Sequence, residues 1–179
     1  MAGMVSLTRE ELRALLKAAK EHCERDWLML LVTFSHGLRV SETIGLRRDH
    51  FRDGHLTVKR LKGSLRTVQP LLTNENELLD ERTAISRYLQ TLSVKEHLFP
   101  ITRFGFDWIV KRHCATAGIT AHKAHAHVLK HTCAMLSIHK AGIENVRQYL
   151  GHRSIASTGA YLRVDDSAAS KAIAAAMGF

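Results

Sequence analysis

The sequence predicts a mainly helical α+β domain that contains one small antiparallel β-sheet. Apolar residues recur at helical spacing along most of the chain, whereas residues 51–72 combine β-branched residues with turn pairs. The chain has 179 residues, of which 45% are hydrophobic, so it is long enough to bury one core. No repeat or linker-like stretch divides it. We therefore expect a single domain over residues 1–179.

The first two helices carry clear sequence signals. Thr8 and Glu11 have the spacing of a capping box, which predicts that a helix begins there. Residues 27–34 are apolar on all sides, which is typical of a helix buried in the middle of a domain. Gly37 is expected to end this helix. Arg39 would then follow a rigid central helix, and the next helix would begin one or two residues later.

The segment after this arginine region predicts the sheet. Asp53-Gly54 and Lys62-Gly63-Ser64 are turn signals between β-branched stretches, and Pro70 is expected to end the last strand. Asn74, with Glu77 three residues on, predicts the cap of the following helix. Further helices are expected at about residues 103–117, 124–140, 143–150 and 154–161, with Gly118 and Gly142 ending the first two.

The amino-acid composition limits which binding partner and which cellular compartment we expect. The net charge of +9 favours a polyanionic partner such as nucleic acid, although many basic proteins bind none. The three cysteines (Cys23, Cys114 and Cys133) show no paired spacing of a zinc or redox motif. No apolar run approaches about 20 residues, and the amino terminus lacks the plan of a signal peptide. We expect a cytoplasmic protein with no membrane segment.

Six side chains suggest phosphate chemistry. In the run LGHRSIASTGAY, a histidine precedes a tyrosine by nine residues, and a phenol at this position could act as a nucleophile. An arginine in GLRVSE offers a planar fork of donors that can hold two phosphate oxygens. The other two tyrosines, Tyr88 and Tyr149, are more easily explained by packing. In chain order the six candidates are Arg39, Lys62, His127, Lys130, His152 and Tyr161.

This constellation resembles the catalytic domain of the tyrosine recombinases, the phage integrase family, whose pattern is Arg, Lys, His-x-x-Arg, His and Tyr. The resemblance covers nearly the whole chain, from about Leu7 to Tyr161. The runs RLK…PLL and LGHR look most similar to the short enzymes that invert fimbrial promoters, although an integrase truncated to its catalytic domain would look much the same. The resemblance implies site-specific recombination of double-stranded DNA through a 3′-phosphotyrosine, without a metal or other cofactor.

The resemblance also implies a role for each residue. Tyr161 would attack the phosphate, and Arg39 would hold its nonbridging oxygens. His127 would accept the phenolic proton, and Lys62, on the hairpin turn, would protonate the leaving 5′ oxygen. His152 would donate a hydrogen bond to the phosphate. Lys59 is the alternative to Lys62 for the hairpin role.

Lys130 departs from the family pattern, which has an arginine at this position. A lysine keeps the charge but loses the bidentate geometry. Loss of one oriented donor from such a site costs about 10²–10³ in rate, part of which a lysine could restore. Two alternatives therefore stay open: a catalytically weak or silent DNA-binding relative, and a nicking enzyme similar to type IB topoisomerases.

Other residues are expected to support DNA binding and assembly. Basic residues near the hairpin and the LGHR turn should contact phosphates; these are Lys59, Arg60, Arg66 and Arg153. Five histidines between residues 122 and 139 lack carboxylate or cysteine partners at motif spacing, so no metal site is predicted there. Residues 165–179 predict an Ala-rich helix, and the resemblance implies that such a terminal helix docks on a neighbouring protomer. The family implies four protomers around two duplexes, whereas the isolated chain could be a monomer.

Overall fold

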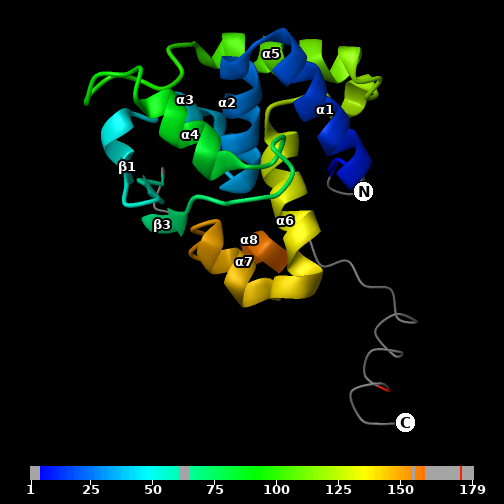
Figure 1. Ribbon diagram of the computed structural model, residues 1–179. Helices are drawn as coiled ribbons and strands as arrows, with labels where there is room; N and C mark the ends of the chain where they lie inside the picture. Colours follow the sequence, from blue (N-terminus) through cyan, green and yellow to red (C-terminus); the bar gives the residue numbers. More distant parts are fainter. Residues whose placement is uncertain (1–4, 61–64, 155, 160–173, 175–179) are drawn as a thin grey trace.

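The computed structural model describes residues 5–60, 65–154, 156–159 and 174 (Figure 1). Its strands are β1 (Phe51–Arg52), β2 (His55–Val58) and β3 (Thr67–Pro70), and two 3-10 turns are η1 (Arg48–His50) and η2 (Ala121–Lys123). The helices are α1 (Arg9–His22), α2 (Glu24–Ser35), α3 (Val40–Ile44), α4 (Glu81–Leu89), α5 (Arg103–Thr116), α6 (His127–Ala141), α7 (Ile143–Tyr149) and α8 (Ala156–Gly159). The predicted mainly helical fold with one small antiparallel sheet is confirmed.

Helix α2 forms the centre of the domain. It packs against α1, α4 and α6, and its residues 28–32 are all buried. Helices α7 and α8 lie at the lower end of α6, and α7 contacts β3 (Figure 1). The carboxyl end of α2 therefore points toward the region where the sheet and α7 meet.

The predicted start of the first helix and the predicted end of the second are confirmed. The Thr8 hydroxyl accepts from the Glu11 amide at 3.1 Å, and the Glu11 carboxylate accepts from the Thr8 amide at 2.8 Å. Gly37 follows α2 with a φ of 55°, and a Cβ there would lie 2.2 Å from Leu150 Cδ2. Two constraints thus favour glycine at position 37: the positive φ of the backbone and the close approach of Leu150 at the end of α7.

The sheet has the order β1-β2-β3, with both pairs antiparallel. Asp53 and Gly54 join the first two strands with φ values of 50° and 72°, the geometry of a two-residue hairpin turn. Leu56 and Val58 bury one face of β2 against the core. The predicted turn at residues 62–64 lies outside the described residues.

Two predicted helix boundaries are wrong. Asn74 does not cap α4, because its Oδ1 accepts from the Asn76 amide at 2.9 Å in a local turn; Asp80 caps the helix instead, accepting from the Thr83 amide. Helix α6 begins at His127 rather than near residue 124, because η2 occupies the preceding residues and ends in a non-helical conformation.

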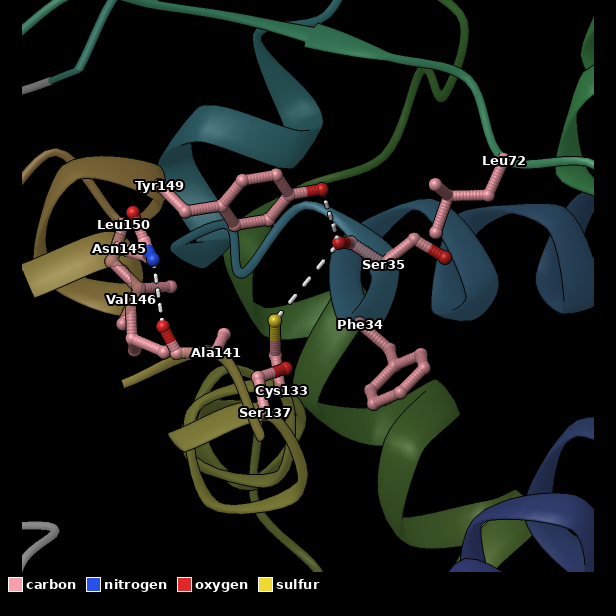
Figure 2. A pocket seen from close by; sticks show the side chains of 10 residues that line it. All are labelled: Phe34, Ser35, Leu72, Cys133, Ser137, Ala141, Asn145, Val146, Tyr149 and Leu150. Carbon is pink, nitrogen blue, oxygen red and sulfur yellow. Dashed lines mark hydrogen bonds between the residues drawn. The ribbon is translucent and has the colours of Figure 1, made fainter. Parts of the chain in front are cut away.

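An apolar pocket lies between the end of α2, α6 and α7 (Figure 2). Two of its polar groups are bonded within the protein: the Tyr149 hydroxyl donates to the Ser35 carbonyl at 2.8 Å, and Asn145 Nδ2 donates to the Ala141 carbonyl at 2.7 Å. The pocket therefore presents mainly carbon atoms. Its lining residues are Phe34, Ser35, Leu72, Cys133, Ser137, Ala141, Asn145, Val146, Tyr149 and Leu150.

Within the described part of the chain, every helix is too short or too polar to cross a membrane. The predicted terminal helix over residues 165–179 lies outside the described residues, apart from position 174.

Candidate active site

Arg39 occupies the junction between α2 and α3, where a single carboxylate holds both its backbone and its side chain. The Arg39 amide donates to Glu42 Oε2 at 2.7 Å, and Nη1 donates to Glu42 Oε1 at 2.9 Å. The Arg39 side chain nevertheless remains 33% exposed. This arrangement fixes the direction of the guanidinium, while part of the side chain stays accessible.

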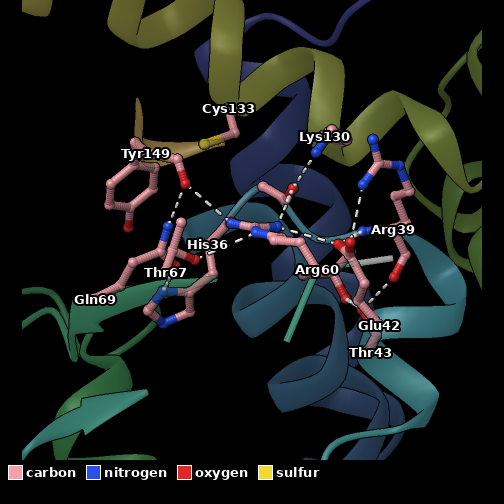
Figure 3. Close-up of polar contacts among 12 residues, drawn as sticks. His36, Arg39, Glu42, Thr43, Arg60, Thr67, Gln69, Lys130, Cys133 and Tyr149 are labelled. Carbon is pink, nitrogen blue, oxygen red and sulfur yellow. Dashed lines mark hydrogen bonds and ion pairs between the residues drawn. The ribbon is translucent and has the colours of Figure 1, made fainter. Parts of the chain in front are cut away.

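Glu42 also binds a second arginine, which reaches it from the end of β2. Arg60 Nη1 lies 3.1 Å from Glu42 Oε2, and both side chains are fully buried (Figure 3). Burial raises the pKa of the Glu42 carboxyl, but the Arg39 amide and the positive charges of Arg60 and Lys130 outweigh it and lower the pKa overall. Glu42 is therefore an anion that organises the surrounding cations.

Arg60 joins two segments that are distant in the sequence. Its guanidinium donates to the carbonyls of His36 at 3.0 Å, Gly37 at 3.2 Å and Tyr149 at 3.0 Å. Sequence analysis placed Arg60 on the surface in contact with phosphates, and the structure corrects this position. Arg60 is buried, and its guanidinium satisfies carbonyls at the ends of both α2 and α7.

Lys130 lies on α6 and points into the same network, where its Nζ donates to the Gly37 carbonyl at 2.8 Å (Figure 3). Only 5% of the residue is exposed. Burial and the neighbouring charges of Arg60 and Arg39 lower its pKa to about 7, although Glu42 opposes the shift. The charge of Lys130 is therefore sensitive to pH near neutrality and to an anion that binds beside it.

His152 follows α7 and is also buried. Its Nδ1 lies 2.9 Å from the hydroxyl oxygen of Thr158 on α8. Burial, together with the charges of Lys130 and Arg39, lowers the pKa of His152 to about 4. The imidazole is thus neutral at pH 7, and it can donate from Nε2 if the Thr158 hydroxyl donates to Nδ1.

The remaining candidates lie around this cluster or outside the described residues. His127 is exposed at the start of α6 and lines a cavity beside Val40, the residue after Arg39. Lys62 and Tyr161 both lie outside the described residues. The other predicted DNA contacts are exposed: Lys59, Arg66 and Arg153.

Sequence analysis missed a buried polar layer beneath the cluster. His36 Nδ1 lies 2.7 Å from Gln69 Oε1, and Gln69 Nε2 donates to the Tyr149 carbonyl at 2.6 Å. This orientation of the amide makes Gln69 Oε1 the acceptor, so His36 carries a proton on Nδ1. His36 Nε2 faces Glu81 Oε1 at 2.8 Å. The layer connects α2, β3, α4 and α7 behind the cations.

Comparison with known proteins identifies the family. The model of the phage integrase family matches residues 6–168. The chain belongs to the phage integrase family. The predicted resemblance is therefore confirmed.

Two relatives within the family illustrate the match. The chain is 37% identical over 169 residues to tyrosine recombinase XerA of Pyrococcus furiosus, covering 89% of this chain and 57% of XerA. It is 32% identical over 164 residues to the type 1 fimbriae regulatory protein FimB of Escherichia coli K12, covering 85% of this chain and 80% of FimB. The chain thus spans little more than half of one relative and most of the other.

Solved structures show the same fold. XerA recombinase superimposes with a TM-score of 0.77 at 23% identity, over 96% of this chain and 65% of that protein. XerH recombinase bound to its difH substrate superimposes with a TM-score of 0.76 at 21% identity, over 97% of this chain and 55% of XerH. The catalytic core of lambda integrase superimposes with a TM-score of 0.68 at 18% identity, over 84% of this chain and 94% of that core.

Proposed function

We propose that this chain is the catalytic domain of a site-specific recombinase that cuts and rejoins double-stranded DNA through a 3′-phosphotyrosine on Tyr161. One observation carries the proposal. Arg39, Lys130 and His152 come from three distant segments and lie near one buried carboxylate, Glu42. Arg39, Arg60 and the protonated form of Lys130 outnumber this carboxylate, and a bound phosphate would balance the excess positive charge.

The cluster would stabilise the five-coordinate phosphorus of the transition state. The Arg39 guanidinium, on a partly exposed side chain, would hold two nonbridging oxygens, and Glu42 fixes its orientation beforehand. Lys130 would add a positive charge, since a nearby phosphate favours its protonated form. His152 would donate one neutral hydrogen bond from Nε2. Because these donors are held by the fold, they need not reorganise during the reaction.

The bond changes require two proton transfers. The Tyr161 oxygen would form a bond to phosphorus while the bond from phosphorus to the 5′ oxygen breaks. His127 would accept the phenolic proton, and Lys62 would give a proton to the departing 5′ oxygen. Attack by a 5′ hydroxyl from another strand would reverse these steps and release the tyrosine. The phosphotyrosine conserves the energy of the broken phosphodiester, so this chemistry needs no cofactor.

The relatives support DNA as the substrate and four protomers as the working assembly. A structure of XerH shows that protein bound to its difH substrate, and one of lambda integrase shows a tetramer on a Holliday junction. In this chain, Lys59, Arg66 and Arg153 are exposed and would contact the DNA backbone. The protein would act on DNA in the cytoplasm, as a monomer until it assembles on its sites.

The apolar pocket of Figure 2 would receive the terminal segment of a neighbouring protomer. Residues 165–179 predict a helix with Ile173 and Met177 on one side, which matches the carbon-rich lining. The double variant Ile173→Asp and Met177→Asp should still bind a single DNA site but lose higher assemblies in gel-shift and crosslinking experiments. Unchanged assembly would contradict this docking.

A nicked substrate tests the catalytic proposal. Because the DNA site is unknown, the probe is a library of nicked duplexes with randomised inverted repeats around a spacer. The full chain should form a covalent adduct that survives denaturing electrophoresis, and Tyr161→Phe should abolish it. Tyr88→Phe is the matched control, since its hydroxyl only donates to the Leu98 carbonyl at 3.3 Å.

Other outcomes would support the alternatives. Binding without an adduct would indicate a silent DNA-binding relative. Relaxation of supercoiled DNA without strand exchange would indicate a topoisomerase-like enzyme.

A further inference from the structure

A second group of chemically active side chains lies where α1, α2 and α5 meet. Asp26, in the first turn of α2, is nine residues from Ser35 at the other end of the helix, which corresponds to about 14 Å along the axis. The group is therefore remote from the cationic cluster around Glu42. We term it the α1–α2 cluster, and its members are His22, Cys23, Asp26 and His113.

The potential ligand atoms of this cluster converge. Those of His22, Cys23 and Asp26 all lie within 4.8 Å of one another. His113 Nε2 lies 3.0 Å from Asp26 Oδ2, and His22 Nδ1 lies 3.4 Å from the same oxygen. Two imidazole nitrogens thus gather around one carboxylate oxygen of Asp26, and a thiol lies near the same carboxylate.

The chemistry and spacing of these atoms fit a zinc ion. Two nitrogens, one sulfur and one oxygen are a donor set that Zn²⁺ binds with tetrahedral geometry. Bonds of about 2.0–2.3 Å in such a site place neighbouring ligand atoms roughly 3.3–3.8 Å apart. The two histidine nitrogens lie 3.0 and 3.4 Å from Asp26 Oδ2, close to this range, and the atoms of His22, Cys23 and Asp26 lie within 4.8 Å of one another, so side-chain shifts would have to draw the ligands together around the ion. We propose that the cluster binds Zn²⁺ and that the ion clamps α1, α2 and α5 together.

The surroundings of Asp26 prepare it to bind through one oxygen. Arg25 donates to Asp26 Oδ1 from Nε at 3.1 Å and from Nη2 at 2.8 Å. Oδ2 is thereby left for the histidines, and a hydrogen-bonded partner of this kind orients a metal-binding carboxylate.

Access and burial also suit a structural metal site. Asp26 and His113 are almost completely buried, whereas the His22 side chain is 37% exposed. An ion could therefore enter from the His22 side and, once bound, would be held by buried ligands.

Cobalt substitution tests the site in the reduced 179-residue chain. One equivalent of Co²⁺ should give the intense visible bands of tetrahedral cobalt together with a near-ultraviolet thiolate-to-cobalt band, and Zn²⁺ should displace both. Cys23→Ser should remove the thiolate band. His22→Gln, at the partly exposed ligand, should weaken cobalt binding at least about tenfold without unfolding the protein.

Two variants serve as controls because they change the same residue types elsewhere. Cys114→Ala removes a buried thiol and His139→Gln removes an exposed imidazole, and both should keep the full cobalt spectrum. Zinc should also raise the thermal midpoint of the unmodified chain but not that of Cys23→Ser. Weak octahedral bands alone, or a thiolate band that persists in Cys23→Ser, would overturn the proposal and leave a hydrogen-bonded cluster that binds no metal.

Discussion

Lys130 should give DNA cleavage and folding stability opposite pH dependences over the same range. Its pKa of about 7 means that the protonated fraction falls from about 0.9 at pH 6 to about 0.1 at pH 8. If the phosphate site needs this charge, cleavage by limiting free protein should fall about tenfold per pH unit above pH 7.5. At saturating DNA the fall should move to higher pH, because the bound phosphate favours the protonated lysine.

Folding stability should respond with the opposite sign. The folded pKa lies below the unfolded value of 10.5, so between pH 7 and 10.5 the unfolded chain binds up to one more proton than the folded chain. The free energy of unfolding should therefore rise with pH in this window, by about 2 kcal/mol between pH 7 and 9. Urea unfolding of the unmodified chain and of Lys130→Met isolates this contribution, because the variant lacks the titrating group.

Single-turnover cleavage of the nicked substrate by Lys130→Arg provides the functional control. Arginine stays charged throughout this range, so the alkaline fall should move to higher pH in the variant. The reasoning is refuted if both proteins lose activity with the same midpoint, which would assign that limb to another group such as Lys62. It is equally refuted if Lys130→Met leaves the pH dependence of stability unchanged.

Three further predictions concern the packing around Gly37, the tautomer of His152 and the DNA contact of Arg153. In Gly118→Ala the new methyl group meets open space, so urea unfolding should show a loss of only about 1 kcal/mol of stability, caused by the positive φ. In Gly37→Ala the methyl group also meets Leu150, so the loss should be about 2 kcal/mol larger. Equal losses in the two variants would contradict the close packing at Gly37. Thr158→Val should slow single-turnover cleavage about fivefold with unchanged DNA affinity, because it removes one hydrogen bond to His152, and Thr158→Ser should restore the rate. Arg153→Ala should weaken binding similarly on all DNA sequences and reduce the salt slope of the logarithm of affinity by about 1; an unchanged slope would exclude a phosphate contact.

Local sequence signals accounted for much of the fold. The capping box at Thr8, the uniformly apolar stretch of α2 and the glycine that ends it each act within a few residues, so the sequence displays them directly. Asn74 failed as a helix cap for an equally local reason. Asn74 and Asp80 are both residue types that favour capping, but Asn74 accepts from the Asn76 amide in a local turn, whereas Asp80 accepts from the Thr83 amide at the start of α4.

The candidate site was harder to predict from the sequence than the fold, because its key contacts join residues that are far apart in the chain. Arg60 bonds Glu42, 18 residues away, and the Tyr149 carbonyl, 89 residues away. Nothing beside Arg60 in the sequence distinguishes it from an exposed basic residue of the same hairpin. Glu42 did carry a signal, since it stands three residues after Arg39, the spacing of a capping interaction.

The two glycines of the GLR and LGH motifs explain how these segments meet. Both have positive φ; a Cβ on Gly37 would strike Leu150, and one on Gly151 would lie 2.9 Å from Arg60 Cγ. The close approach brings carbonyls from both segments within reach of one guanidinium. A lysine at position 60 could not bridge them, because it lacks the planar array of donors. The positions of Arg39 and His152 thus depend on a buried arginine and two glycines that need not contact DNA themselves.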